Sequence, residues 1–317
     1  MTSSPLPVID LRRAANPDGL RELAIEIDRA CRDVGFLSVI GHGIPAATFD
    51  AVYSAMSDLV ASSAEVKHSL LSPSDHPFRG WRTYTNDDGS TAVERLQVNH
   101  FDDAEAALAA GIDEQYADYF VPNVWPPADD AKAAWVVCFD EMRAVGDQLM
   151  GLFAVALGLE RNYFASVLDR DVSTFAVNAY PAQTTADGDG PAVIFREHSD
   201  SGTLTVLHQR GDYAGLQILT VDGTWVAVPV DPEALTINIG DLMARWTNDR
   251  WTSTAHRVVA SDDPAASRAS ITTFHLPNVD AVVEPLEPCL ADEDARYDPV
   301  RVYDWEAQFL ARIYTNR

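Results

Sequence analysis

Three side chains in the second half of the chain have the types and spacing of a metal site. His198 and Asp200 form a His-x-Asp pair, and His256 follows far downstream in the run Ser-Thr-Ala-His-Arg-Val. Two imidazoles and one carboxylate make a facial triad, which holds a divalent iron on one side and leaves three coordination positions open for oxygen and organic ligands. The pattern therefore favours an iron enzyme that activates oxygen.

The spacing of these residues also constrains the fold. Residues i and i+2 of an extended strand point to the same face, so His198 and Asp200 would reach one metal from a single strand. His256 must come from a distant strand, which favours a rolled antiparallel sheet, either a barrel or a sandwich. In the alternative interpretation His198 bonds to a turn, Asp200 begins a turn, and His256 is a hydrogen-bonded core residue.

A second group of polar residues follows the same i, i+2 rule. Arg268 and Ser270 combine a planar guanidinium with a hydroxyl, which together suit a carboxylate. Asn178 and Tyr180 place an amide and a phenol on one face of another expected strand, so the four could hold both ends of a dicarboxylate. The alternative is a surface ion pair for Arg268, a turn role for Asn178 and a core role for Tyr180.

The elements that must position these residues differ between the two halves of the chain. The first 170 residues are expected to be mostly helical, and residues 72–127, rich in Pro and Gly, to be loop and short helix. After Ser173 the chain changes to short apolar runs separated by turns, which predicts a sandwich or small barrel. Helices are expected at 18–33, after Pro45 and at 129–157, and strands at 7–11, 34–40, 174–180, 203–208, 215–220, 225–230, 235–239, 256–260 and 269–276.

Composition limits the partners. The chain has 317 residues and a formal net charge of -25, which repels nucleic acid and anionic membranes. No run approaches the roughly 18 apolar residues of a membrane span, and the first residues lack the features of a signal peptide, so we expect a soluble, cytoplasmic protein. Cys31, Cys138 and Cys289 have no metal-type spacing and are expected to be free thiols.

The chain resembles the isopenicillin N synthase-like family of Fe(II)- and 2-oxoglutarate-dependent dioxygenases, which includes plant flavonoid and gibberellin oxidases. The resemblance covers nearly the whole sequence and includes Gly41-His42-Gly43-Ile44, His198-Ser199-Asp200-Ser201-Gly202, Asn238-Ile239-Gly240-Asp241 and Arg268-Ala269-Ser270. A serine stands at 199 where threonine is commoner in the family, and it keeps the hydroxyl.

The resemblance implies a fold that is mainly β with flanking helices around a double-stranded β-helix, or jelly roll. It implies one catalytic unit, with a mostly helical N-terminal region at 1–170 of the non-haem dioxygenase type, a core at 171–280 and a C-terminal segment at 281–317. His198, Asp200 and His256 would bind Fe(II), and Arg268 with Ser270 would hold the distal carboxylate of 2-oxoglutarate. Tyr180 and Asn178 would assist this co-substrate.

The implied reaction consumes O2 and 2-oxoglutarate, yields succinate and CO2, and hydroxylates, desaturates or cyclises a small organic substrate. Isopenicillin N synthase itself works without 2-oxoglutarate, so an iron oxidase of that type is one alternative, and a non-catalytic jelly-roll binding protein is another. The chain would act as a monomer or a homo-oligomer.

The expected substrate pocket is aromatic with an arginine, which would suit an amphipathic organic acid or secondary metabolite. Alternatively, these aromatics only pack the loop and the arginines are solvated. The predicted lining residues are Phe78, Arg79, Trp81, Arg95, Phe195, Leu204 and Met243.

Overall fold

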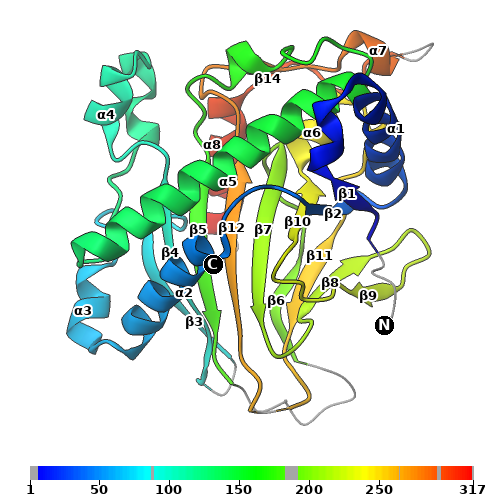
Figure 1. Ribbon diagram of the computed structural model, residues 1–317. Coiled ribbons are helices and arrows are strands. Elements are labelled where there is room, and N and C mark those ends of the chain that lie inside the picture. The colour runs from blue at the N-terminus through cyan, green and yellow to red at the C-terminus, as the bar shows by residue number, and fades with distance from the viewer. Residues whose placement is uncertain (1–5, 87–88, 183–191, 264, 291–293, 316–317) are drawn as a thin grey trace.

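Two mainly antiparallel sheets lie at the centre of the protein, as the computed structural model shows for residues 6–86, 89–182, 192–263, 265–290 and 294–315 (Figure 1). The larger sheet has eight strands, in the spatial order β1 (Val8–Asp10), β2 (Phe36–Ile40), β10 (Leu235–Ile239), β7 (Leu204–Gly211), β12 (Arg268–His275), β5 (Thr174–Tyr180), β4 (Thr91–Asn99) and β3 (Gly80–Thr85). The smaller has the order β6 (Val193–His198), β11 (His256–Val259), β8 (Leu216–Leu219) and β9 (Trp225–Ala227), and β13 (Val282–Val283) pairs with β14 (Val300–Arg301).

Helices cover one face of the large sheet. The long helix α5 crosses β5, β12 and β7 (Figure 1) and packs against α1 and α2. The α-helices are α1 (Pro17–Asp33), α2 (Ala46–Ala61), α3 (Ala64–Ser69), α4 (Ala104–Ala109), α5 (Asp129–Ala156), α6 (Asp241–Trp246), α7 (Glu287–Leu290) and α8 (Val302–Thr315). Short 3-10 helices lie at Leu11–Ala15, Glu114–Tyr119 and Ala165–Val167.

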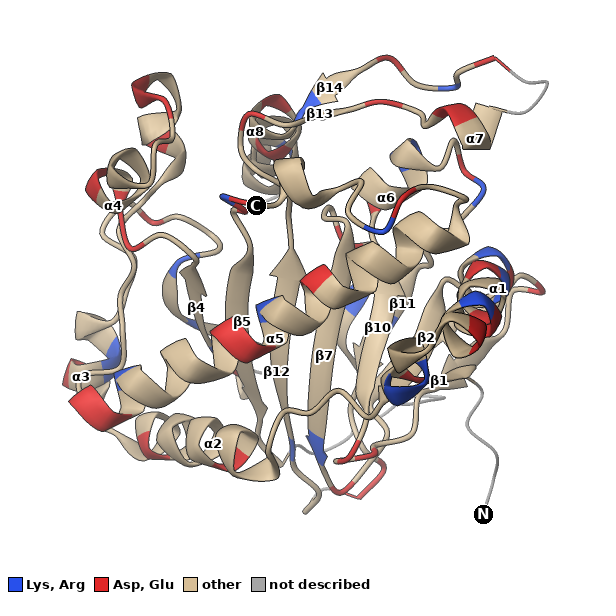
Figure 2. Cartoon of the chain, turned by 45° about the horizontal axis from the view of Figure 1, so that its top comes forward, with Lys and Arg blue, Asp and Glu red and all other residues tan. Residues whose placement is uncertain are grey.

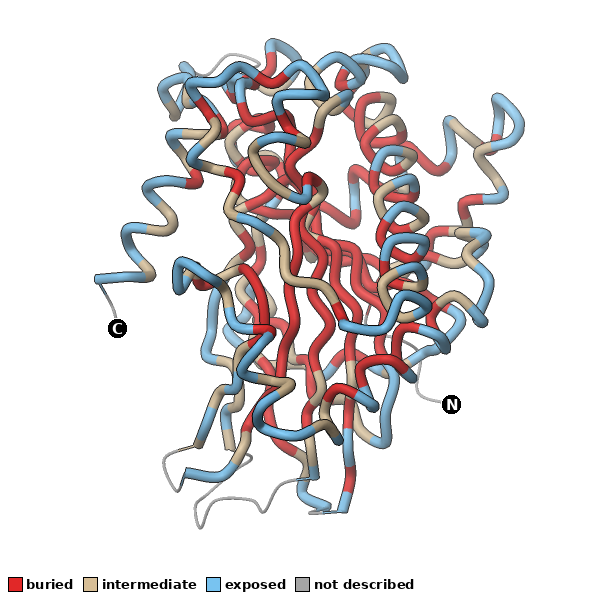
Figure 3. The backbone as a smooth tube through the Cα atoms, turned by 90° about the vertical axis from the view of Figure 1, so that its left-hand side faces the viewer, coloured by how far each residue is buried: buried red, intermediate tan, exposed pale blue. Residues whose placement is uncertain are grey.

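The contact between α5 and the sheet depends on a glycine. Gly146 faces the ring of His275 on β12, and a Cβ at this position would lie 2.6 Å from a ring carbon. Only glycine therefore lets the helix come this close. The side chains of α5 and of the covered sheet face form one large buried apolar cluster, and Figure 3 shows the buried residues concentrated along the central strands.

The sequence predicted many elements but missed the strands β3 and β4 and the helices α6 and α8. Strands at 174–180 and 235–239 match β5 and β10, and α1 and α5 lie where helices were expected. The interpretation of 72–127 as mostly loop and short helix holds for α4 and the 3-10 helix at Glu114–Tyr119, but it is wrong for β3 and β4, which join the large sheet there. Residues 95–99 of β4 do alternate between polar and apolar, but residues 91–95 do not, and the Pro and Gly residues of the surrounding segment favour loop.

The charged residues lie mainly outside this core. Figure 2 shows Asp and Glu on the helices and outer loops, whereas the central strands carry few of them. Among the described residues, no helix is both long and apolar enough to span a membrane. The three cysteines are free thiols, as predicted, and Cys31 and Cys138 are buried.

Candidate metal site

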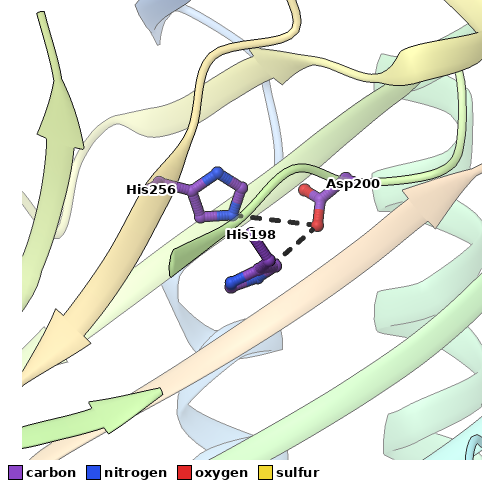
Figure 4. Close-up of side chains that lie close together, drawn as sticks. All are labelled: His198, Asp200 and His256. Carbon is purple, nitrogen blue, oxygen red and sulfur yellow. Dashed lines mark ion pairs between the residues drawn. The ribbon is translucent and has the colours of Figure 1, made fainter. Parts of the chain in front are cut away.

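Three side chains converge between the two sheets (Figure 4). His198 ends β6 and His256 begins β11, and these two residues are direct partners in the antiparallel pairing. Asp200 lies in the turn after β6, and not on the strand as its spacing suggested. Strand pairing therefore brings the two imidazoles together, and the turn brings the carboxylate to them.

The distances fit one divalent ion. One Asp200 oxygen, Oδ1, lies 3.9 Å from Nε2 of His198 and 3.7 Å from Nε2 of His256. Two ligand atoms that each lie about 2.1 Å from a metal can be at most about 4.2 Å apart, so both pairs can share an ion. Within the described part of the chain, these three form the one cluster of His, Cys, Asp or Glu with such convergence.

Both imidazoles are oriented by backbone carbonyls. Nδ1 of His198 lies 2.8 Å from the Arg196 carbonyl, and Nδ1 of His256 lies 3.1 Å from the Thr254 carbonyl. A carbonyl only accepts, so each Nδ1 carries the proton and each Nε2 offers its lone pair toward Asp200. Burial lowers the pKa of His256 despite the opposing effect of Asp200, which keeps this ring neutral as a ligand must be.

The second oxygen of Asp200 is held by the large sheet. Thr205 on β7 donates its hydroxyl to Oδ2 at 2.5 Å, and Asn238 on β10 donates its amide to the same atom at 2.8 Å. Burial raises the pKa of Asp200, but His256, His198 and these two hydrogen bonds outweigh it, so the net pKa is lowered. The carboxylate stays ionised with Oδ1 free to bind a cation.

A tight backbone crossing fixes the turn that carries Asp200. The amide of Asp241 donates to the Asp200 carbonyl at 2.8 Å, and the amide of Leu242 donates to the Gly202 carbonyl at 3.0 Å. A Cβ on Gly240 would lie 2.2 Å from the Gly202 oxygen. The Asn-Ile-Gly-Asp motif thus supplies the Asp241 amide, which holds the backbone of Asp200, and Gly240, whose missing Cβ leaves room for the turn that carries Asp200.

The second polar group lies in the same cavity. In the pairing of β5 with β12, Tyr180 is opposite Arg268 and Asn178 is opposite Ser270. The Asn178 amide donates to the Ser270 hydroxyl at 3.2 Å, and the Arg268 guanidinium lies over the Tyr180 ring at 4.6 Å. The four predicted residues therefore form two adjacent rows of one sheet face.

This group has unused hydrogen-bonding capacity. Arg268 is 4% exposed and donates one bond, to Gln209 at 2.8 Å, while its Nε and Nη1 have no partner among the described residues. The buried Oδ1 of Asn178 also has none there. Buried polar atoms are normally paired, so two orphaned guanidinium donors beside a cavity fit a site for an anion that uses them.

The predicted substrate residues divide into two sets. Phe195 and Arg95 line the cavity, together with the triad and the Arg268 group. The others do not: Leu204 and Met243 are fully buried in the apolar core, where each packs against other side chains and not against a ligand. Phe78 stacks on Phe309 of α8, Trp81 lies beneath Lys67, and Arg79 is buried near Tyr119 and Glu306.

Several lining residues were missed from the sequence. They point into the cavity from several strands; alternation from Arg268 would have found Thr272 and Phe274, and alternation from His256 would have found Val258. They are Phe36, Thr205, Leu207, Leu216, Asn238, Val258, Thr272 and Phe274.

The fold and site define a double-sheet protein with a two-histidine, one-carboxylate metal centre and an adjacent anion pocket. Two sequence profiles match the chain: the 2OG-Fe(II) oxygenase superfamily at residues 172–277, and the "non-haem dioxygenase in morphine synthesis N-terminal" family at residues 6–128.

Known proteins resemble the chain over most of its length. Validamycin A dioxygenase of Streptomyces hygroscopicus subsp. limoneus is 31% identical, over 90% of this chain and 80% of that protein. Flavanone 3-dioxygenase 2 of Oryza sativa subsp. japonica is 31% identical, over 92% of this chain and 80% of that protein. The crystal structure of a full-length Neurospora crassa protein in complex with alpha-KG superposes with a TM-score of 0.82 at 25% identity, over 98% of this chain and 96% of that one.

The chain therefore belongs to the 2OG-Fe(II) oxygenase superfamily, in its isopenicillin N synthase-like branch. It is an oxidoreductase of this class, with Fe(II) and 2-oxoglutarate as cofactor and co-substrate. The predicted fold class, a jelly-roll core with flanking helices, is confirmed.

Proposed function

We propose that His198, Asp200 and His256 hold Fe(II) and that the protein hydroxylates a small organic substrate while 2-oxoglutarate is converted to succinate and CO2. The observation that carries this proposal is the convergence of two oriented imidazoles and one carboxylate oxygen beside a cavity with an unpaired guanidinium. When bound, the iron supplies the oxidising chemistry with O2, and the protein supplies binding, orientation and exclusion of water.

Arg268 is the proposed anchor for the distal carboxylate of 2-oxoglutarate. Its free Nη1 and Nε can each donate a charge-assisted bond to an anion, and the Ser270 hydroxyl, one row along the strand, can add a further one. Asn178 holds the Ser270 hydroxyl, and the Tyr180 ring supports the guanidinium from below. This end of the cavity would fix the co-substrate so that its other end reaches the metal.

The small-molecule substrate would bind in the remaining part of the cavity. Its walls are apolar on the small sheet, where Phe195, Leu216 and Val258 lie, and carry Arg95 on the large sheet. A further structure of the Neurospora crassa protein contains thymine together with alpha-KG, although its 24% identity supports only the shared fold. An apolar wall with one cation suits an organic acid with an apolar body.

Binding measurements under nitrogen test the proposed ligands. The wild-type protein should bind one Fe(II) and then one 2-oxoglutarate by calorimetry. His198→Ala should lose the iron, because one of three ligands is removed, while Arg268→Ala should keep the iron and bind 2-oxoglutarate about 10- to 100-fold more weakly.

Two variants serve as matched controls. His68→Ala removes an exposed histidine of α3, and Arg257→Ala removes a guanidinium bonded to Gln217 next to His256. Both should bind iron and 2-oxoglutarate as the wild type does. Oxygen uptake with substrate but without succinate would contradict the proposed reaction.

A further inference from the structure

Arg95 is a buried cation without a counter-ion. It lies on β4, is 9% exposed and lines the cavity between the sheets. Among the described residues no carboxylate pairs with it and no acceptor bonds its guanidinium, and its Nε is a buried atom with no partner. A buried, unpaired guanidinium is costly, so its presence in a cavity points to a ligand that neutralises it.

The sheet register places Arg95 apart from the co-substrate anchor. Arg95 is opposite Asn178, and Asn178 is opposite Ser270. The backbone of Arg95 therefore lies in the cross-strand row of Ser270, next to the row that contains Arg268. Its guanidinium lies 5.8 Å from the ring of Phe274, two rows further along β12 in the direction away from Arg268. The two arginines therefore extend toward opposite ends of the cavity.

Phe274 lies at the end of the cavity that is nearer to the metal ligands. It is opposite Thr205 in the pairing of β12 with β7, and the Thr205 hydroxyl holds Asp200 at 2.5 Å. The Arg95 guanidinium thus approaches the end of the sheet that carries the metal ligand. A group bound to it would lie on the metal side of the cavity, where a substrate must bind to be oxidised.

Formal charge also separates the roles of the two arginines. With Fe(II) and dianionic 2-oxoglutarate bound as proposed above, the charges of the ion, the co-substrate, Asp200 and Arg268 cancel. The charge of Arg95 is then left over, in a cavity whose other walls are largely apolar. One monoanionic group would compensate it.

We infer that Arg95 is a specificity-determining residue that binds the carboxylate of a monocarboxylic acid substrate, with the apolar body of the acid packed near Phe274 and the small sheet. This inference rests on the proposed function, because it assumes that 2-oxoglutarate occupies Arg268. Arg79 does not share this role, since it is buried outside the lining and its guanidinium is bonded to the Phe78 carbonyl at 2.7 Å.

Matched acids and amides test the inference. Phenylacetate, cinnamate and octanoate, each beside its primary amide, are titrated into the Fe(II) and 2-oxoglutarate complex under nitrogen, and binding is followed by the visible absorption of that complex. At least one acid should bind the wild type about 10- to 100-fold more tightly than its amide, the range expected for charge-assisted hydrogen bonds. Arg95→Met should lose this preference, and Arg95→Lys should keep part of it.

Arg82→Met is the control. Arg82 is directly opposite Arg95 on β3, but its guanidinium is bonded to Asp75 and to the His76 carbonyl. This variant should keep the wild-type preference for acids. The affinity for 2-oxoglutarate should be unchanged in every one of these variants.

Several results would overturn the inference. They are a wild type that binds no acid more tightly than its amide, an Arg95→Met protein that keeps the preference, or a loss of 2-oxoglutarate affinity in Arg95→Met like that expected for Arg268→Ala. The melting temperature adds a further criterion: it should not fall in Arg95→Met because no hydrogen bond or ion pair is lost, and a fall with unchanged acid preference would make Arg95 structural. If the wild type binds no 2-oxoglutarate, the proposed function fails, and titration of the same acids and amides into the metal-free protein, followed by calorimetry, still tests Arg95.

Discussion

The two faces of the large sheet use buried polar residues in opposite ways. On the face covered by helices, both ring nitrogens of His275 have partners, Asp147 and the Thr203 hydroxyl, each at 3.0 Å. On the face toward the small sheet, Arg268 and Arg95 keep guanidinium nitrogens without partners among the described residues. Paired groups stabilise the fold, whereas an unpaired guanidinium beside a cavity is available to a ligand. The Thr273 hydroxyl on the helix-covered face also lacks a partner in the described part of the chain, but it is uncharged and lies outside the cavity lining.

His208 is a second example on the helix-covered face. Its ring stacks on Phe49 at 3.9 Å, its Nδ1 meets the Tyr53 hydroxyl at 2.9 Å, and its Nε2 meets the Pro232 carbonyl at 3.0 Å. By contrast, the Thr205 hydroxyl and the Asn238 amide on the cavity face both donate to Asp200, so their hydrogen bonds position a metal ligand. The comparison predicts different outcomes for substitutions on the two faces.

The largest effect is expected on the cavity side. His256→Ala removes a metal ligand, so Fe(II) should no longer bind and activity should fall by more than about 1,000-fold, as when an essential member of a catalytic unit is removed. Metal analysis and succinate release measure these losses. The circular dichroism spectrum should stay that of a folded protein, and unfolding of the metal-free variant would contradict the comparison.

The next effect concerns acid stability and the helix-covered face. Burial lowers the pKa of His208 to about 4 from 6.5, so the folded state resists protonation that the unfolded chain accepts. The folded state therefore loses roughly 3 kcal/mol of stability as the pH falls from 6.5 to 4, while above pH 6.5 the ring is neutral in both states and has no such effect. Urea unfolding at several pH values should show a smaller loss in His208→Phe, and parallel curves for the two proteins would refute the assignment.

His275→Ala should destabilise the protein without disturbing the site. It leaves the Thr203 hydroxyl and Asp147 without their ring partners and opens space against Gly146, at a cost of about 1–3 kcal/mol. Denaturant unfolding measures this cost. Affinity for Fe(II) and 2-oxoglutarate should be unchanged, and weakened iron binding would show that the two faces are coupled.

The smallest effect is expected for the stability of Arg268→Met. The substitution removes a mostly unpaired buried cation and one hydrogen bond to Gln209, so the free energy of unfolding should change by less than about 1 kcal/mol. Thermal and urea unfolding of the ligand-free protein check this value. A large loss of stability would mean that Arg268 is structural, despite its unpaired nitrogens.

Local sequence pattern was enough to predict many of the elements and much of the site. His198 and His256 are ends of strands, and Arg268 and Ser270 follow the i, i+2 spacing that shares one face. β4 was missed because its alternation is confined to residues 95–99, within a segment whose Pro and Gly residues favour loop. Asp200 was expected on a strand, yet the backbone crossing at Gly240 places it in a turn.

The sequence alone determined the types of ligand, their order and the class of chemistry, because these depend on residue identity and short-range spacing. Only the tertiary structure decided which polar side chains remain free. Arg79 and Arg95 are equivalent in the sequence, but one is buried outside the cavity and the other faces it unpaired. Pairing and burial arise from contacts between residues far apart in the chain, and local pattern does not encode them.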